Sequence, residues 1–282
     1  MKNLSLLAFL ILIFITSNSK VSSTETSAAT PKKVHWDLVW QDEFDKEGAP
    51  DSTKWGYDVG GHGWGNNESQ FYTVSRLENA RVEKGKLIIE ARKESYNGAN
   101  YTSARLMSKH KGDFKYGRIV VRAKVPKGRG TWAAIWMLPT DWAYGNWPSS
   151  GEIDIMEHVG CTQNEIHGTV HTGAFNHLKG TQKGNSTIIT DATTNFHDYI
   201  IEWDELKINF FIDGELYFTF DNKGQGPSEW PFDQRFHIIL NIAIGGSWGG
   251  MNGIDNAIFP QKMEIDYVRV YQNLKIQNQI VN

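Results

Sequence analysis

The chain has 282 residues, 40% of them hydrophobic, and a formal net charge of −3. This length fits one large β domain or two small ones, and the weak charge argues against nucleic acid or an anionic membrane as a partner. Eleven tryptophans together with 27 glycines favour a turn-rich β protein with an aromatic-lined groove.

The first 34 residues have the composition of export and linker segments. Residues 1–22 begin with Lys2 and continue into an apolar run, Leu4–Ile15, that is too short to span a membrane. This pattern is typical of a secretory signal peptide, and a retained N-terminal anchor is the alternative. Residues 23–34 are rich in Ser, Thr and Ala, which predicts a flexible linker. We therefore expect a secreted protein, extracellular or periplasmic, and its single cysteine, Cys161, excludes an internal disulfide.

Short segments of alternating apolar and polar residues follow from residue 36 onward, which is the pattern of half-buried strands. The predicted strands are 36–44, 81–83, 86–92, 102–108, 117–124, 131–138, 152–157, 165–172, 195–203, 207–212, 215–220, 236–244 and 262–271. Asp213-Gly214, between two such segments, is a strong hairpin signal. No long helical periodicity is present, so we expect an all-β fold, a β-sandwich or jelly roll, over residues 35–272 and a polar tail at 273–282.

The stretch Gly151-Glu-Ile-Asp-Ile-Met-Glu-His158 carries three acids close together, Glu152, Asp154 and Glu157. On a regular strand Glu152 and Asp154 share one face, whereas Glu157 points to the other face. A one-residue bulge at Ile155-Met156 would bring Glu157 back beside the other two acids. The stretch alone fits either a solvated strand face or the two carboxyl groups of a glycosidase.

Tryptophans cluster just before the acidic strand, at positions 132, 136, 142 and 147. Trp132 and Trp136 lie four apart on a predicted strand and so share a face. Core packing would explain such residues, but indole rings also stack on the apolar faces of sugars, and we favour a sugar-binding groove. Trp248 is flanked by glycines, so it has few neighbours to bury it and fits the same role.

Two histidines, His167 and His171, share a face of the predicted strand 165–172. Such a pair suggests zinc, but a third ligand at a usual spacing is not evident and no His-Glu-x-x-His motif is present. We interpret them as neutral hydrogen-bonding groups in a sugar cleft. No Gly-x-Ser-x-Gly motif supports a serine hydrolase, and nothing in the sequence around Cys161 supports a cysteine nucleophile.

With these tryptophans around it, the acidic strand resembles the family-16 glycoside hydrolases, and within them the laminarinase group of endo-1,3-β-glucanases. The resemblance covers roughly residues 36–272. Other segments similar to that family, in its order, are Trp40–Phe44, Trp64–Glu68, Gly117–Pro126, Thr131–Leu138 and Asp266–Gln272. The resemblance implies a jelly-roll β-sandwich of two antiparallel sheets with a concave substrate cleft.

The same resemblance implies roles for particular residues. Glu152 would be the nucleophile, Glu157 the general acid/base and Asp154 an assisting group between them, in a retaining double displacement that requires no cofactor. The residues expected to bind substrate are Asn66, Arg105, Trp132, Trp136, Trp147, His171 and Trp248. A structural Ca²⁺ is implied at Glu43, the carbonyl of Gly85, and Asp266.

The expected activity is hydrolysis of internal β-1,3 bonds of glucans such as laminarin, by a monomer with no nucleic-acid or membrane partner. An agarase, another β-galactanase or a mixed-linkage β-glucanase of the same fold is the alternative. Met156 is typical of laminarinases, agarases and other galactanases rather than of lichenases. A non-catalytic glucan-binding protein is the alternative of a different class, and the presence of both Glu152 and Glu157 disfavours it.

Overall fold

The computed structural model describes residues 35–273. The predicted signal peptide at 1–22, the linker at 23–34 and nearly all of the polar tail at 273–282 lie outside the described residues. Within the described part, no helix has the length and apolar character that crossing a membrane requires.

The described residues are almost entirely β-structure, with two short 3-10 turns, η1 (His177–Lys179) and η2 (Asn256–Ile258). The strands in chain order are β1 Asp37–Asp42, β2 Gly56–Asp58, β3 Gln70–Tyr72, β4 Ala80–Val82, β5 Leu87–Tyr96, β6 Ala99–Ser103, β7 Arg105–Met107, β8 Asp113–Phe114, β9 Gly117–Lys124, β10 Thr131–Pro139, β11 Glu152–Val159, β12 Glu165–His171, β13 Lys183–Ile188, β14 His197–Trp203, β15 Lys207–Ile212, β16 Glu215–Asp221, β17 Phe236–Ile244 and β18 Gln261–Gln272.

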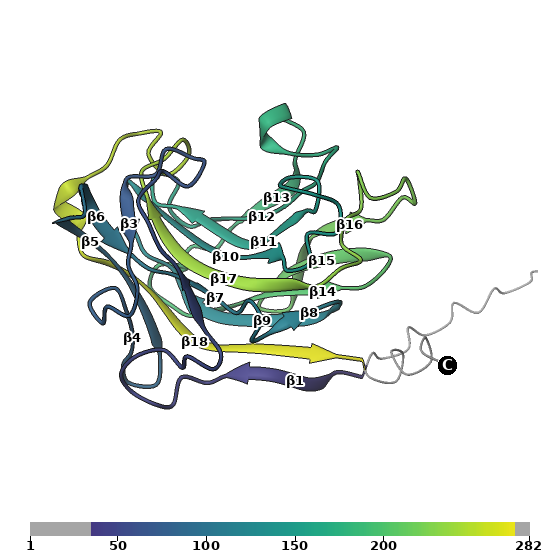
Figure 1. Cartoon of the computed structure of the whole chain (residues 1–282), viewed down its shortest axis with the longest axis horizontal. Coiled ribbons are helices and arrows are strands. Elements are labelled where there is room, and N and C mark those ends of the chain that lie inside the picture. The colour runs from purple at the N-terminus through teal and green to yellow at the C-terminus, as the bar shows by residue number, and fades with distance from the viewer. Residues whose placement is uncertain (1–34, 274–282) are drawn as a thin grey trace, which may run out of the picture. The chain divides into compact units, whose positions relative to one another are not determined.

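These strands form two sheets that pack face to face (Figure 1). The ten-stranded sheet has the order β16-β15-β14-β9-β18-β5-β6-β3, with β1 beside β18 and β4 beside β5. The eight-stranded sheet has the order β13-β12-β11-β10-β17-β7-β2, with β8 beside β17. Only the pair of β3 with β6 is parallel in this part of the chain. The predicted all-β sandwich of two largely antiparallel sheets is confirmed.

Every predicted strand is present, with ends that differ by a few residues. The segment 102–108 is interrupted at Ala104, which separates β6 from β7. The hairpin between β15 and β16 is confirmed, and its turn residues Asp213 and Gly214 have φ values of 51° and 87°. Four strands, β2, β3, β8 and β13, are not predicted. Three of them have only two or three residues, too few to show alternation, and β13 is a polar strand at a sheet edge.

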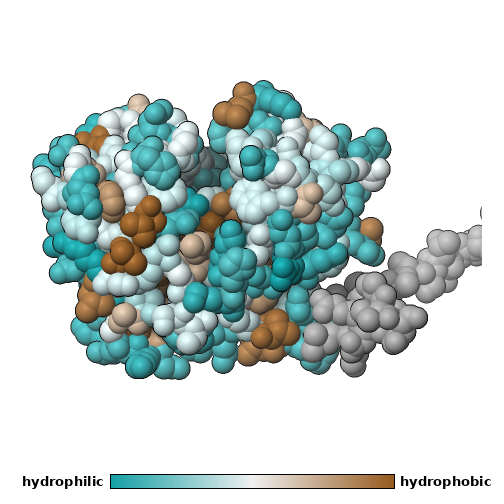
Figure 2. Space-filling view, viewed as in Figure 1, coloured by the Kyte–Doolittle hydropathy of each residue, from teal (hydrophilic) through white to brown (hydrophobic). Residues whose placement is uncertain are grey.

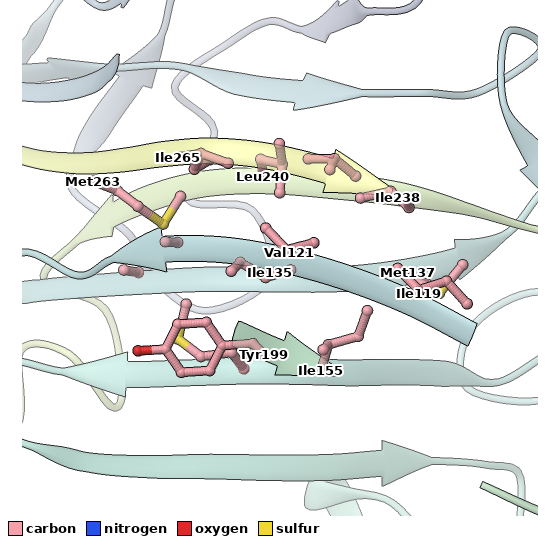
Figure 3. Packing of buried hydrophobic residues seen from close by; sticks show 14 of the residues in the cluster. Ile119, Val121, Ile135, Met137, Ile155, Tyr199, Ile238, Leu240, Met263 and Ile265 are labelled. Carbon is pink, nitrogen blue, oxygen red and sulfur yellow. The ribbon is translucent and has the colours of Figure 1, made fainter. Parts of the chain in front are cut away.

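The core lies between the inner faces of the two sheets (Figure 3). Ile119, Val121 and Ile265 from the ten-stranded sheet meet Ile135 and Leu240 from the eight-stranded sheet, and all five are fully buried. Burial of one such side chain contributes about 1.5–3 kcal/mol. The core therefore gives the eight-stranded sheet a rigid support on its inner face.

The opposite face of the eight-stranded sheet is turned toward a cleft. Along β10, Ala133 and Ile135 point into the core, whereas Trp132 and Trp136 point away from it and line the cleft, as strand alternation requires. The prediction that these two tryptophans share a face is confirmed. In Figure 1 this sheet is curved, and loops rise on both sides of β10, β11 and β17.

Candidate active site

The acidic strand β11 contains a bulge. Its neighbour β10 pairs Trp136 with Asp154 and Ile135 with Met156, so Ile155 has no partner on β10. The pairing of β11 with β12 is shifted between residues 154 and 157 as well. The bulge predicted at Ile155-Met156 is confirmed, and Ile155 is the extra residue.

The bulge sets the direction of all three acids. Ile155 and Met156 are successive residues, yet both are buried in the hydrophobic core. Because two successive side chains point inward, the next one, Glu157, returns to the face that carries Glu152 and Asp154, and all three acids line the cleft. The strand thus brings together the three carboxyls that the sequence predicts as catalytic.

Two tryptophan side chains fix the outer carboxyls. Trp147 Nε1 donates a hydrogen bond to Glu152 Oε2 at 3.0 Å. Trp132 Nε1 donates a hydrogen bond to Glu157 Oε1, also at 3.0 Å. An indole N–H can only donate, so each bond orients its carboxyl and favours the ionised form.

His171 of β12 lies beside Glu152 and Asp154 in the acidic cluster. β11 and β12 pair it directly with Glu152. Its Nε2 atom is 3.3 Å from Asp154 Oδ2 and 3.7 Å from Glu152 Oε1. When it is protonated, this histidine stabilises negative charge on Glu152 and Asp154.

The three carboxyls hold protons at unusually high pH. Burial, and next the negative charge of Asp154, raise the pKa of both Glu152 and Glu157 to about 8. Burial also raises the pKa of Asp154 to about 8, and its hydrogen bond with Glu152 acts in the opposite direction. Because like charges repel across this short distance, ionisation of one carboxyl makes the next proton harder to remove.

Glu152 is the carboxyl best placed to ionise first. It has contacts with both the Trp147 N–H and His171, whereas Glu157 accepts one bond, from Trp132. The Glu152 side chain is also more exposed than that of Asp154, at 15% against 4%. Once Glu152 carries the charge, Glu157 keeps its proton to a higher pH. The two glutamates therefore have unequal surroundings in the same cleft, and Glu152 has the larger number of contacts that favour a carboxylate.

The surface is hollowed by an open cleft (Figure 2). The acids lie where the two halves of this cleft meet. One half has a volume of about 500 Å³ and the other about 640 Å³. Glu152 and Glu157 line both halves. A chain-like ligand bound along the whole cleft would therefore extend past the carboxyls in both directions.

All seven residues predicted to bind substrate line this cleft. The first half contains Arg105, Trp136 and Trp147, and the second contains His171 and Trp248. Asn66 and Trp132 line both halves.

Aromatic side chains cover much of the cleft wall. Trp132 and Trp248 form an edge-to-face pair with ring centroids 5.5 Å apart, and Trp248 also meets His167 at 4.9 Å. The Arg105 guanidinium lies between the rings of Trp64 and Trp136, at 4.7 and 4.6 Å from their centroids. These contacts hold the indole rings in fixed orientations, which suits stacking against a rigid ligand such as a sugar.

A half-buried carboxylate that the sequence does not single out, Glu68, lies in the first half of the cleft. It accepts hydrogen bonds from Gln70 Nε2 at 2.6 Å, Asn66 Nδ2 at 3.2 Å and Tyr72 Oη at 3.3 Å. Burial raises the pKa of Glu68, while these bonds and Arg105 lower it. Glu68 thus fixes the side chain of Asn66, which is one of the predicted substrate contacts.

The same network continues across the sheet. Tyr72 Oη accepts a hydrogen bond from Asn241 Nδ2 at 3.0 Å, and Asn241 Oδ1 accepts one from Trp136 Nε1 at 2.7 Å.

His177 is a further cleft residue without a sequence signal, and its ring lies 4.9 Å from that of Trp147. For Glu68, the only signal in the sequence is that the segment Trp64–Glu68, which ends at this residue, resembles the family.

The three residues of the predicted calcium site are brought to one region of the ten-stranded sheet. Glu43 follows the Asp42–Val268 pair of β1 and β18, Gly85 precedes the Leu87–Ile265 pair of β5 and β18, and Asp266 follows Ile265. This sheet does not line the cleft.

Both acids of this group are paired with arginine side chains, and both keep oxygen lone pairs. Arg269 donates to both carboxylate oxygens of Glu43 at 2.8 Å, which lowers the pKa of Glu43 and keeps it ionised. Arg122 Nε is 3.5 Å from Asp266 Oδ2. Each carboxylate oxygen retains a lone pair beside its arginine, so both acids can still supply oxygen ligands.

Comparison with known proteins identifies relatives with the same architecture. The family model described as glycosyl hydrolases family 16 matches residues 67–269. A β-glucanase from Rhodothermus marinus is 56% identical over 253 residues, which cover 87% of this chain and 88% of that protein.

Solved structures agree with this match. The X-ray structure of the laminarinase from Rhodothermus marinus has a TM-score of 0.84 and 56% identity, and the match covers 86% of this chain and 99% of that chain. A non-specific endo-β-1,3(4)-glucanase of family 16 has a TM-score of 0.82 and 47% identity, covering 86% of this chain and 94% of that chain.

Proposed function

Because the chain belongs to family 16 of the glycosyl hydrolases, we propose that it is a retaining endo-1,3-β-glucanase that acts on glucans such as laminarin. The observation that carries this proposal is the pair Glu152 and Glu157, which line both halves of an aromatic cleft. A site in the middle of an open cleft suits cleavage of internal bonds. The names of the relatives support the β-1,3-glucan as substrate.

The proposed reaction is a double displacement. The ionised Glu152 carboxylate attacks the anomeric carbon while Glu157 transfers its proton to the departing glycosidic oxygen, which leaves as a sugar hydroxyl. The product is a glycosyl ester on Glu152. Glu157, now ionised, removes a proton from water, and the resulting oxygen attacks the anomeric carbon and releases Glu152. Trp147 and His171 stabilise the charge that returns to Glu152.

Asp154 is proposed to set the pH range of this reaction, because its charge is the largest cause after burial for the raised pKa of Glu152 and Glu157. Asp154→Asn removes that charge, so both pKa values should fall and the whole profile of kcat/KM against pH should move by about 1–2 units to lower pH. Titration of kcat/KM on laminarin measures this. A profile that stays in place or moves to higher pH would contradict the assignment.

The substrate is tested with laminarin, lichenan and agarose at equal mass, followed by sizing of the products. We expect reducing ends from laminarin at the highest rate, with a series of oligosaccharides early in the reaction because internal bonds are cleaved. Activity on lichenan in addition would indicate a broader β-1,3(4) specificity like that of one structural relative. Release of reducing ends from agarose but not from laminarin would contradict the proposal and indicate a galactanase. No release from any of the three polysaccharides would indicate a non-catalytic binding protein.

A structural calcium ion held by Glu43, the Gly85 carbonyl and Asp266 is a further part of the proposal. Such an ion would supply no step of the reaction and would link β1, β5 and β18. Removing calcium with a chelator should lower the melting temperature by about 5–10 °C, since an ion at 100 times its Kd contributes about 2.7 kcal/mol. Glu43→Gln should abolish this difference. Equal melting temperatures with and without chelator would exclude the ion.

We also propose that the protein is exported and acts as a secreted monomer. The support is the sequence of residues 1–22, and cleavage after Ser19 or Ser23 would fit it equally well. N-terminal sequencing of protein recovered outside the cytoplasm should begin at Lys20 or Thr24. Recovery only with membranes, starting at Met1, would indicate the retained anchor instead. Sedimentation of the released protein should give a single species with the mass of one chain.

A further inference from the structure

We propose that Glu152, Asp154 and His171 form a binding site for a divalent transition metal, with zinc as the best fit, and that zinc bound there blocks the active site. These three residues each offer one ligand atom, and the three atoms lie within 4.8 Å of one another. In residues 35–273 this is the only group of three or more acidic, histidine or cysteine side chains so arranged. The site goes beyond the proposed function, because metal binding needs no catalysis.

The distances match a tetrahedral zinc site. Zinc bonds of about 2.0–2.2 Å place neighbouring ligand atoms roughly 3.3–3.6 Å apart. His171 Nε2 lies 3.3 Å from Asp154 Oδ2 and 3.7 Å from Glu152 Oε1. Two edges of the ligand triangle are therefore at or close to the required length, and the third, between Glu152 and Asp154, is within 4.8 Å.

The ligand atoms are available to a metal ion. Asp154 Oδ2 is buried and makes no hydrogen bond, although His171 Nε2 lies 3.3 Å from it, and the Asp154 side chain is 4% exposed. A buried carboxylate oxygen without a partner is costly, and a cation would compensate for it. His171 Nδ1 also makes no hydrogen bond, so the ring can carry its proton there and present the Nε2 lone pair.

The donor set selects zinc over the hard cations. Calcium takes six to eight oxygen ligands and magnesium requires nearly octahedral oxygen coordination, whereas one imidazole nitrogen and two carboxylates suit zinc. Glu152 faces the cleft with its side chain 15% exposed. Three protein ligands with the fourth position open to water is the arrangement of an accessible zinc site.

Zinc at this position would compete with the substrate. The ion would bind the Glu152 carboxylate, whose lone pair the proposed reaction needs for attack on the anomeric carbon. It would also place a positive charge and a water molecule in the middle of the cleft. Inhibition by zinc should therefore be reversible by a chelator and relieved by high concentrations of glucan.

The test is calorimetric titration of the full chain with ZnCl₂, with CaCl₂ in every sample so that the proposed calcium site stays saturated. We expect one zinc ion per chain, and His171→Ala should weaken the affinity about tenfold or more, since one of three ligands is lost. His167→Ala is the matched control, because His167 lies on the same face of β12 but outside the ligand group. This variant should bind zinc within about threefold of the unmodified chain.

Three results would overturn the proposal: no zinc binding by the unmodified chain, equal weakening by both histidine substitutions, or undiminished zinc binding in saturating oligosaccharide. Melting curves without zinc establish that both variants fold. Laminarin oligosaccharides should weaken zinc binding if the two share the site, and undiminished zinc binding in saturating oligosaccharide would place the metal elsewhere. Zinc binding by a chain that proves inactive on laminarin would leave this site standing and remove only the proposed glucanase activity.

Discussion

Glu152→Gln is expected to lower kcat on β-1,3-glucan by on the order of 10⁴-fold or more, because an amide cannot form the glycosyl ester. The substitution keeps the shape of the side chain, so binding of laminarin oligosaccharides should remain. Single-turnover kinetics and calorimetric binding measure the two quantities separately. Residual activity above about a tenth of the unmodified rate would exclude Glu152 as the nucleophile.

The thermal stability of Glu152→Gln tests the raised pKa of Glu152 independently of activity. The pKa of Glu152 is raised from 4.5 to about 8 in the folded protein, so the fold loses stability as the pH rises from about 4.5 to about 8, and the full penalty is present at pH 9. Glutamine cannot ionise, and Glu152→Gln should therefore melt no lower than the unmodified chain at pH 9. Glu264→Gln on β18 is the matched control, since Glu264 pairs with Lys124 of β9 and both lie in the ten-stranded sheet, which does not line the cleft. It should keep full activity.

Glu157→Ala is expected to lower kcat on natural glucan by about 10²–10⁴-fold, the usual contribution of a positioned acid/base. An activated aryl β-glucoside should suffer less in the first step, because its leaving group needs no proton. Its glycosyl-enzyme should then accumulate, since no base activates water. Added azide should restore turnover and yield the β-glycosyl azide, because the anion enters the space left by the side chain and needs no base.

Glu157→Gln is the control for this rescue. Glutamine also lacks acid/base function but fills the space beside Trp132, whose N–H contacts residue 157. Azide should therefore rescue Glu157→Ala and leave Glu157→Gln unchanged. Formation of the α-glycosyl azide, or no rescue of either variant with the activated substrate, would remove Glu157 from the acid/base role.

Much of the site is predictable because it is local in sequence. Glu152, Asp154 and Glu157 lie on one strand, and the break in their alternation predicts the bulge that the pairing of β10 with β11 contains. The shared face of Trp132 and Trp136 follows from their spacing alone. For these residues, strand periodicity determines which side chains reach the cleft.

The rest of the site depends on contacts between distant parts of the chain. Glu68 and Tyr72 reach Asn241 only because β3 and its preceding loop approach β17 in the folded protein. No local pattern distinguishes Asn241 from other polar residues of a strand. The proposed zinc site also depends on contact between separate strands, since Glu152 lies beside His171 only through the pairing of β11 with β12. The sequence alone does not show the strand register that pairs His171, rather than His167, with Glu152.

The most direct test of the proposed mechanism is proton NMR of the first sugar released from laminarin, recorded before mutarotation. Glu152, the proposed nucleophile, and Glu157, the proposed acid, lie on one strand face, separated only by the bulge and Asp154. Two successive displacements at the anomeric carbon should release the β-anomer first. Initial release of the α-anomer would mean a single displacement by water, and would contradict the assignment of Glu152 as a covalent nucleophile.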